Sequence, residues 1–140
     1  MGVIPLCKLN NSKTIIETIL YTNPSPTSKQ SAYTITLSKS IDNFDYIGFE
    51  YRANITRDER INILVTPIDI RKSNSGSGPS DSTNRPNLSI CGHRYYTYYA
   101  RRILYDSDTS LAIGSAYRMD TATGGENTEM AIITRIIGYK

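Results

Sequence analysis

The chain has 140 residues, with 16 Lys and Arg against 13 Asp and Glu, so its formal net charge is +3. This length suits one domain that can hold a core without a metal or a disulfide. The shares of apolar (39%) and charged (21%) residues exclude a disordered composition. The basic residues are scattered and no apolar run could span a bilayer, so neither nucleic-acid binding nor a membrane partner is expected. No secretory signal is recognisable either.

The residue types favour strands over helices. The chain has 11 Tyr, 2 Phe and no Trp, together with many Thr, Ser, Ile and Asn. β-branched residues and Tyr fit a pleated, half-buried surface, whereas the strong helix formers Ala and Leu are few. The composition therefore predicts an all-β protein.

In the first third of the chain, apolar residues recur at every second position in short windows, as in strands. Residues 14–21, 33–38 and 47–52 are predicted strands. The Asn-Pro-Ser-Pro run at 23–26 cannot continue a helix or a central strand, so it is a predicted loop. Asp42-Asn43 is expected to turn the chain between two strands.

The middle of the chain begins with a predicted strand over residues 61–65. Proline has no N–H to give to a ladder, so Pro67 predicts a bulge or a sheet edge, beyond which the apolar set shifts to Ile68 and Ile70. Residues 73–86 are rich in Ser, Gly, Asn and Pro and show no periodicity. They are predicted to form a flexible surface loop.

The window 91–105 is predicted to be one long strand with two amphipathic faces. Tyr95, Tyr99 and Arg101 share one face, and Tyr96, Tyr98 and Arg102 share the other. A β-sandwich strand with one solvent-exposed face should instead carry clearly polar residues on that face. Tyr and Arg are favoured at protein interfaces and on sugar-contacting surfaces. Three explanations stay open: one face is core and the other has no partner, one face is a subunit interface, or one face contacts a ligand.

The last predicted strands cover residues 111–113 and 129–137. Seven or eight strands at these spacings predict an antiparallel β-sandwich or a jelly-roll-like fold. The whole chain, 1–140, is expected to be a single domain, in which residues 1–18 form an N-terminal segment.

Catalytic chemistry has no strong candidate. His93 is the one histidine, and Cys91 shares its face of the predicted strand, so a Cys-His pair is conceivable. A small thiol beside a partly exposed imidazole is the favoured interpretation. Carboxylates for glycoside hydrolysis fall mostly in predicted turns, where Asp binds the backbone: Asp45, Glu50, Asp106, Asp108 and Asp120. No metal-ligand spacing or phosphate loop is present, so neither a cofactor nor an enzymatic activity is expected.

The two cysteines, Cys7 and Cys91, lie far apart in the sequence. A disulfide between them cannot be deduced from their spacing. Reduced thiols, in a protein that is assembled inside a cell, are the favoured state.

Several short turn-and-strand patterns are spread along most of the chain. They read YTNP at 21–24, DYIGFEY at 45–51, Arg-Arg at 101–102, DTSLAIGSA at 108–116 and IIGYK at 136–140. Together they resemble a module of tail-fibre, tail-appendage and head-fibre proteins in tailed phages and prophages of gut and other low-GC bacteria. The resemblance spans residues 19–140.

The resemblance implies a β-rich virion domain that works in a homo-oligomer, commonly a trimer, and contacts other virion proteins. The implied function is structural or adhesive, at the surface of a virion assembled in the host cytoplasm. Adhesion would bring a host-surface glycan as a further partner. A monomeric carbohydrate-binding β-sandwich module is the alternative.

On the first interpretation, the candidate interface is the Tyr-rich strand: Tyr95, Tyr96, Tyr98, Tyr99, Arg101 and Arg102. One of its faces would pack in the core and the other against a neighbouring subunit. Arg101 and Arg102 would lie near the seam and pair with acidic groups such as Asp106 or Asp108.

Overall fold

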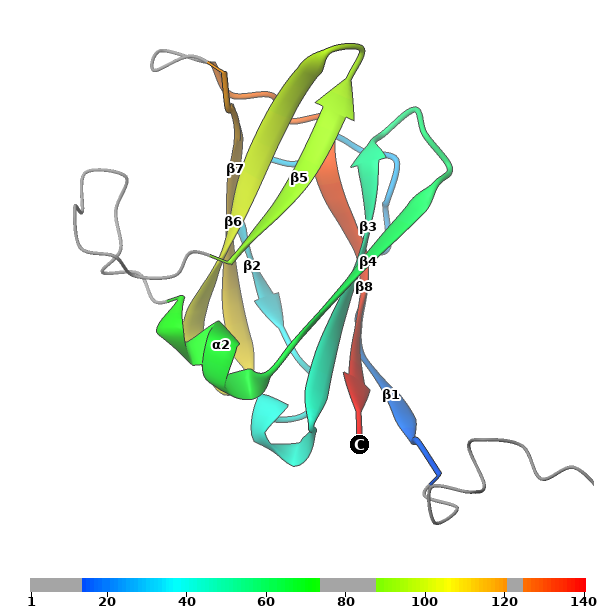
Figure 1. Ribbon diagram of the computed structural model, residues 1–140, viewed down its shortest axis with the longest axis vertical. Coiled ribbons are helices and arrows are strands. Elements are labelled where there is room, and N and C mark those ends of the chain that lie inside the picture. Colours follow the sequence, from blue (N-terminus) through cyan, green and yellow to red (C-terminus); the bar gives the residue numbers. More distant parts are fainter. Residues whose placement is uncertain (1–13, 74–87, 121–124) are drawn as a thin grey trace, which may run out of the picture.

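The computed structural model describes residues 14–73, 88–120 and 125–140. Among these residues, two antiparallel sheets of four strands each pack face to face (Figure 1). The predicted antiparallel β-sandwich is therefore confirmed, with eight strands.

Each sheet combines strands from both halves of the chain. The first sheet consists, in spatial order, of β1 (Glu17–Thr22), β8 (Met130–Tyr139), β3 (Tyr46–Asn54) and β4 (Arg60–Val65). The second sheet consists of β2 (Tyr33–Thr36), β7 (Ser110–Arg118), β6 (Thr97–Ser107) and β5 (Ser89–Arg94). Because β8 lies between β1 and β3, the first sheet is completed only by the last strand.

The core lies between the sheets and is built by alternate residues of the strands. On β3, Ile47, Phe49 and Tyr51 face inward and are buried. The second sheet supplies further buried apolar residues: Ile35, Ile90, Ile103, Leu111 and Ile113. Because side chains alternate across a strand, Glu50 and Arg52 point to the outer face of the first sheet.

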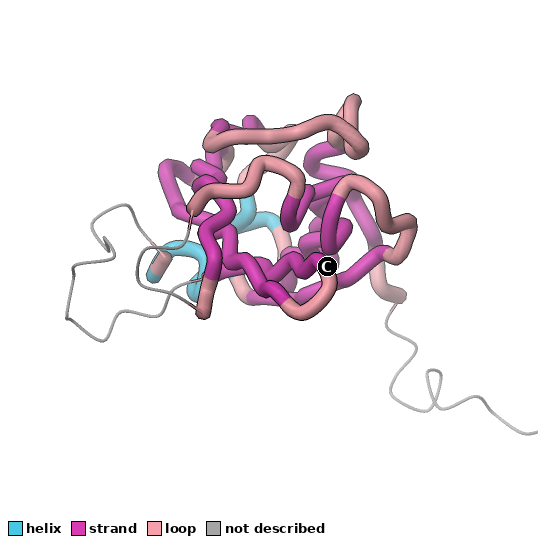
Figure 2. Tube along the Cα trace, turned by 90° about the horizontal axis from the view of Figure 1, so that it is seen from above, coloured by secondary structure: helices cyan, strands magenta, loops and turns pink. Residues whose placement is uncertain are grey.

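The segment after β4 is a helix, so the bulge or sheet edge predicted at Pro67 is wrong. Helix α2 (Pro67–Lys72) begins with a capping box. The Asp69 N–H donates to the Thr66 hydroxyl (3.2 Å), and the Thr66 N–H donates to the Asp69 carboxylate (3.3 Å). Proline suits the first helical position, where its missing N–H leaves no bond unmade. The Thr-x-x-Asp spacing around Pro67 was the sequence signal for this helix, which lies to one side of the strands (Figure 2).

Ser73, predicted as the first residue of a surface loop, is buried at the end of α2. Its hydroxyl donates to the Ile103 carbonyl oxygen (2.6 Å), and its own carbonyl oxygen accepts from the Tyr105 N–H (2.6 Å). These bonds fasten α2 to β6. The rest of the predicted loop, 74–86, lies outside the described residues, as do residues 1–13 of the predicted N-terminal segment.

Candidate functional site

The predicted long strand over 91–105 is a hairpin. β5 ends at Arg94, which pairs with Thr97 at the start of β6, and Tyr95 and Tyr96 form the two-residue turn between them. Two-residue hairpin turns usually carry Gly, Asn or Asp, which adopt a positive φ easily. Tyr95-Tyr96 contains none of these turn-favouring residues. The prediction of one continuous strand was therefore wrong.

The two turn tyrosines project away from the fold. Tyr95 has a φ of 55°, a left-handed conformation that costs about 1–2 kcal/mol in a residue with a Cβ. Tyr95 is 84% exposed and Tyr96 is 96% exposed. Their rings therefore gain almost no packing within the domain that could offset this strain.

More exposed apolar side chains lie on the outer face of the second sheet, beside the turn. Tyr98 faces His93 across the hairpin, with ring centroids 6.0 Å apart. The Met119 N–H donates to the Tyr98 carbonyl oxygen (2.9 Å), which brings the end of β7 alongside. We define the tyrosine tip as five residues that are each more than half exposed: Tyr95, Tyr96, Tyr98, Tyr117 and Met119.

Arg101, predicted at a subunit seam, lies in the interior and is fully buried. Its guanidinium donates to four backbone carbonyl oxygens: those of Met130 (2.9 Å), Gly114 (2.9 Å), Gln30 (3.0 Å) and Ser31 (3.4 Å). Burial lowers the pKa of Arg101, and the nearby Tyr33 and Glu126 oppose this effect. The seam prediction is wrong for Arg101, which holds strands of its own chain together.

The acidic partners proposed for the arginine pair are partly engaged elsewhere. Asp108 accepts from the Tyr105 hydroxyl (2.6 Å) and from Arg71 of α2 (3.4 Å). Arg71 also binds Asp42 of the short 3-10 helix η1 (Ile41–Asn43), so this ion-pair cluster joins α2 to η1 and to the turn at Asp108. Arg102 follows the buried Arg101, is half-buried, and by alternation points to the outer face of the second sheet.

Of the two strand faces that the sequence left open, alternation places Tyr99 on the inner one, with Arg101. Cys91 and His93 lie on one face of β5, as predicted. Cys91 is exposed, and its sulfur lies 3.8 Å from that of Met119. The pairing of Cys91 with Cys7 falls outside the described residues.

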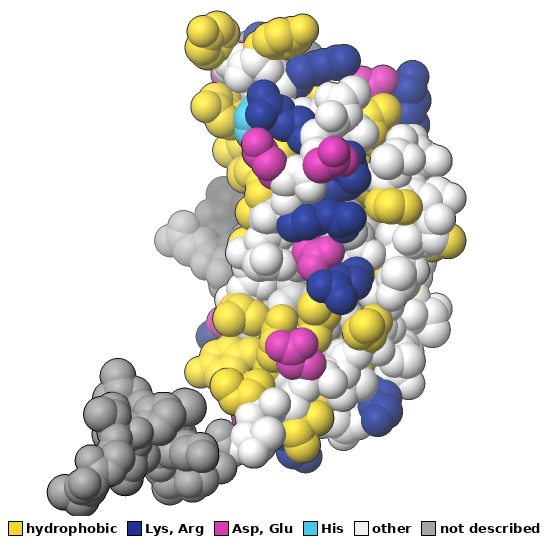
Figure 3. All heavy atoms as spheres, turned by 90° about the vertical axis from the view of Figure 1, so that its right-hand side faces the viewer, with side chains coloured by type: hydrophobic (Ala, Val, Ile, Leu, Met, Phe, Trp, Pro, Cys, Tyr) yellow, Lys and Arg dark blue, Asp and Glu magenta, His cyan; other side chains and the backbone are white. Residues whose placement is uncertain are grey.

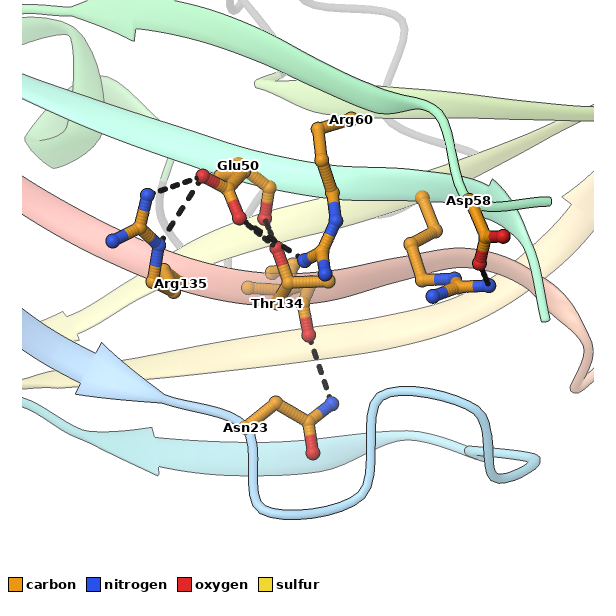
Figure 4. Close-up of polar contacts among 8 residues, drawn as sticks. Asn23, Glu50, Asp58, Arg60, Thr134 and Arg135 are labelled. Atoms are coloured by element: carbon orange, nitrogen blue, oxygen red, sulfur yellow. Dashed lines mark hydrogen bonds and ion pairs between the residues drawn. The ribbon is translucent and has the colours of Figure 1, made fainter.

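A polar cluster centred on Glu50 lies on the outer face of the first sheet (Figure 4). One carboxylate oxygen accepts from Nη2 (2.6 Å) and Nε (3.2 Å) of Arg135. The other accepts from Arg60 (3.1 Å) and from the Thr134 hydroxyl (2.7 Å). The bonds from Arg135 lower the pKa of Glu50, burial opposes this, and Thr134 and Arg60 lower it further.

The cluster depends on a β-bulge that the sequence did not reveal. Glu50 pairs with Arg135 and Tyr51 pairs with Ile133, so Thr134 is an extra residue on β8. The bulge turns the Thr134 hydroxyl toward Glu50 and leaves its carbonyl oxygen to accept from the Asn23 N–H (2.8 Å). The cluster borders an open groove of about 450 Å³ lined by Thr22, Asn23, Pro26, Glu50, Arg60, Thr134 and Arg135.

The same face carries an apolar hollow of about 560 Å³ near its lower end. Charged side chains alternate along the middle of this face, and hydrophobic side chains gather below them (Figure 3). The hollow is lined by Ile15, Glu17, Asp45, Tyr46, Leu64, Tyr139 and Lys140. Gly48 shapes it, because a Cβ there would lie 2.8 Å from the Tyr139 ring. Because Gly48 has no Cβ, the Tyr139 ring can pack against it, beside Leu64.

Other kinds of site receive no support from the part of the chain that the structure describes. In residues 14–73, 88–120 and 125–140, no group of three or more His, Cys, Asp or Glu could hold a metal ion. None of the described helices has the length and apolar character to cross a membrane. No protein-family model matches the chain, and no curated protein matches it either.

Proposed function

We propose that this chain is a structural protein of a phage virion, a fibre, appendage or decoration subunit that acts by contact rather than by catalysis. It associates with copies of itself, as a trimer, and with other virion proteins. The turn-and-strand patterns at 21–24, 45–51 and 108–116 support the virion context by resemblance. The β-sandwich suits the proposal because it gives a rigid frame for surface contacts.

The observation that carries the proposal is the tyrosine tip. Tyr95 is strained and, like Tyr96, almost fully exposed, so neither side chain serves the stability of its own domain. Residues kept in strained conformations point to a function outside the local fold. The five residues of the tip expose on the order of 500 Å² of mostly aromatic surface, close to the largest apolar patch of a typical monomer. Patches of this size are often functional.

The test of this proposal is the native mass of the purified chain, measured by light scattering and sedimentation over a range of concentrations. We expect an oligomer that weakens when Tyr95 and Tyr96 are both replaced by Ser. Mass spectrometry of purified phage particles tests the virion location separately. A chain that stays monomeric up to about 1 mM, the weak end of protein association, contradicts the proposal.

The groove beside Glu50 favours a second candidate, a monomeric carbohydrate-binding module that takes a host-surface glycan. Its lining offers guanidinium, hydroxyl and amide groups, which hydrogen-bond sugars. However, none of the described residues that line the groove is aromatic, while the most exposed tyrosines lie at the hairpin turn. Ligand sites usually combine both kinds of group, so this candidate comes second. Calorimetric binding of bacterial surface polysaccharide that is lost in Arg60→Ala would favour it.

A further inference from the structure

A three-fold assembly needs two different contact surfaces on every copy. In a two-fold dimer the same patch meets itself, whereas in a ring of three one surface must meet another surface on the next copy. The tyrosine tip and the apolar hollow are two such surfaces. The tip lies at the turn between β5 and β6, and the hollow lies near the C-terminus at the opposite end of the molecule (Figure 1).

The two surfaces match in shape and in apolar character. The tip projects, because Tyr95 and Tyr96 extend from a two-residue turn. The hollow is concave, and its main apolar lining residues are more than half exposed: Ile15, Tyr46 and Leu64. A ring inserted there would cover apolar surface on both copies at once.

The polar groups at the two surfaces also match. The hollow has two carboxylates at its rim, Glu17 and Asp45, against one cation, Lys140. Tyrosine hydroxyls entering the hollow would donate to these carboxylates. The tip is flanked by Arg94 and Arg118, whose side chains stay more than 40% exposed although each has an acidic neighbour in its own chain.

We infer that the tyrosine tip of one copy docks in the apolar hollow of the next copy, as a head-to-tail contact. This inference rests on the proposed function, and it names the partner as a second copy of this chain. The rotation between neighbours decides whether the contact closes into a ring of three or continues as a filament.

The contact is expected to be weak. Each surface is smaller than the roughly 800 Å² per partner of a standard stable interface. We therefore expect a dissociation constant between about 1 µM and 1 mM for one contact. Closure into a ring strengthens the assembly, because a copy must break two contacts to leave.

The experiment uses two variants, each of which removes one surface. Tyr95→Ser with Tyr96→Ser removes the tip, and Leu64→Arg places a charge in the hollow. The control is Ile68→Arg on α2, because Leu64 and Ile68 are both 62% exposed. Circular dichroism checks that every variant folds. Native mass is then measured for each protein alone and for an equimolar mixture of the tip and hollow variants.

We expect the wild type and the Ile68→Arg control to assemble, and each of the other variants to stay monomeric alone. The mixture should form pairs and stop there, because one intact tip meets one intact hollow and the remaining ends are both blocked. Assembly of the Leu64→Arg variant alone, or a mixture that stays monomeric, overturns the inference but leaves the proposed function standing. A monomeric wild type overturns both.

Discussion

The Arg101 guanidinium donates two hydrogen bonds to one oxygen, the backbone carbonyl of Met130, from Nε (3.3 Å) and Nη2 (2.9 Å). Arg101 belongs to β6 of the second sheet, and Met130 begins β8 of the first. A buried cation therefore bridges the two layers of the sandwich. Its further bonds to Gln30 and Ser31 fix the segment that leads into β2.

Replacing Arg101 by Leu should destabilise the fold strongly. The substitution leaves several buried carbonyl oxygens without their donor, and each such loss costs about 1–3 kcal/mol. We expect a total on the order of 4 kcal/mol in urea-induced unfolding, a large part of the stability of an ordinary domain. The control is Arg118→Leu, where only an exposed ion pair with Asp120 is lost and solvent screening should keep the change in stability small. Equal effects of the two substitutions would contradict the bridging role of Arg101.

Replacing Gly92 by Ala should be far more harmful than replacing Gly114 by Ala. A Cβ at Gly92 would lie 2.2 Å from the Ala53 carbonyl oxygen and 2.5 Å from the Ala131 nitrogen, so backbone would have to move. A Cβ at Gly114 would meet its nearest neighbour at 3.6 Å, an ordinary contact. We expect Gly92→Ala to cost about 3 kcal/mol or more, as overpacking does. A similar thermal midpoint for both variants would mean that the sheets do not approach so closely at Gly92.

Glu50 should make stability depend on pH in the acidic range. Its pKa in the folded state lies below the ordinary value of about 4.3. The stabilisation is therefore present in full above about pH 4.3 and is lost as the pH falls through the folded-state pKa. Glu50→Gln should cost about 1 kcal/mol at neutral pH, since both arginines are roughly 40% exposed and solvent screens them.

The measurement is the difference in unfolding free energy between the wild type and Glu50→Gln at several pH values. It should shrink as the pH falls below about 4. The control is Glu59→Gln, because the Glu59 side chain is 69% exposed and pairs with a neighbouring arginine of its own turn. A difference that stays constant down to pH 2 would show that ionised Glu50 adds nothing to the free energy of unfolding.

Replacing Tyr95 by Asn should stabilise the isolated domain and weaken self-association. Asn tolerates the left-handed conformation better than Tyr, so about 1 kcal/mol of strain is relieved. Tyr96→Asn is the matched control, because Tyr96 lies in the same turn and is at least as exposed, but has no positive φ. Thermal unfolding measures the first effect and native mass the second. A Tyr95→Asn variant no more stable than Tyr96→Asn would remove the argument from strain.

The positions of these strands could be predicted from the sequence because they depend on the pattern of neighbouring residues. In residues 61–65 and 33–38, apolar side chains at every second position can be buried together only on one face of a strand. The structure places strands at both sites, β4 and β2. The number of strands and their turns then favoured a sandwich, which is what formed.

The candidate sites could not be predicted from the sequence in the same way, because each site is formed by segments that lie far apart in the chain. Alternation assigned Tyr95 and Arg101 to one strand face, but the turn at Tyr95-Tyr96 sends the first to the surface while the fold buries the second. Glu50 meets Arg135 only because β8 returns beside β3 with an extra residue at Thr134. The sequence by itself determined which segments extend, since that depends on neighbouring residues. Only the tertiary structure decided which charges are buried and which tyrosines stay exposed, because burial depends on what packs against each strand from elsewhere in the chain.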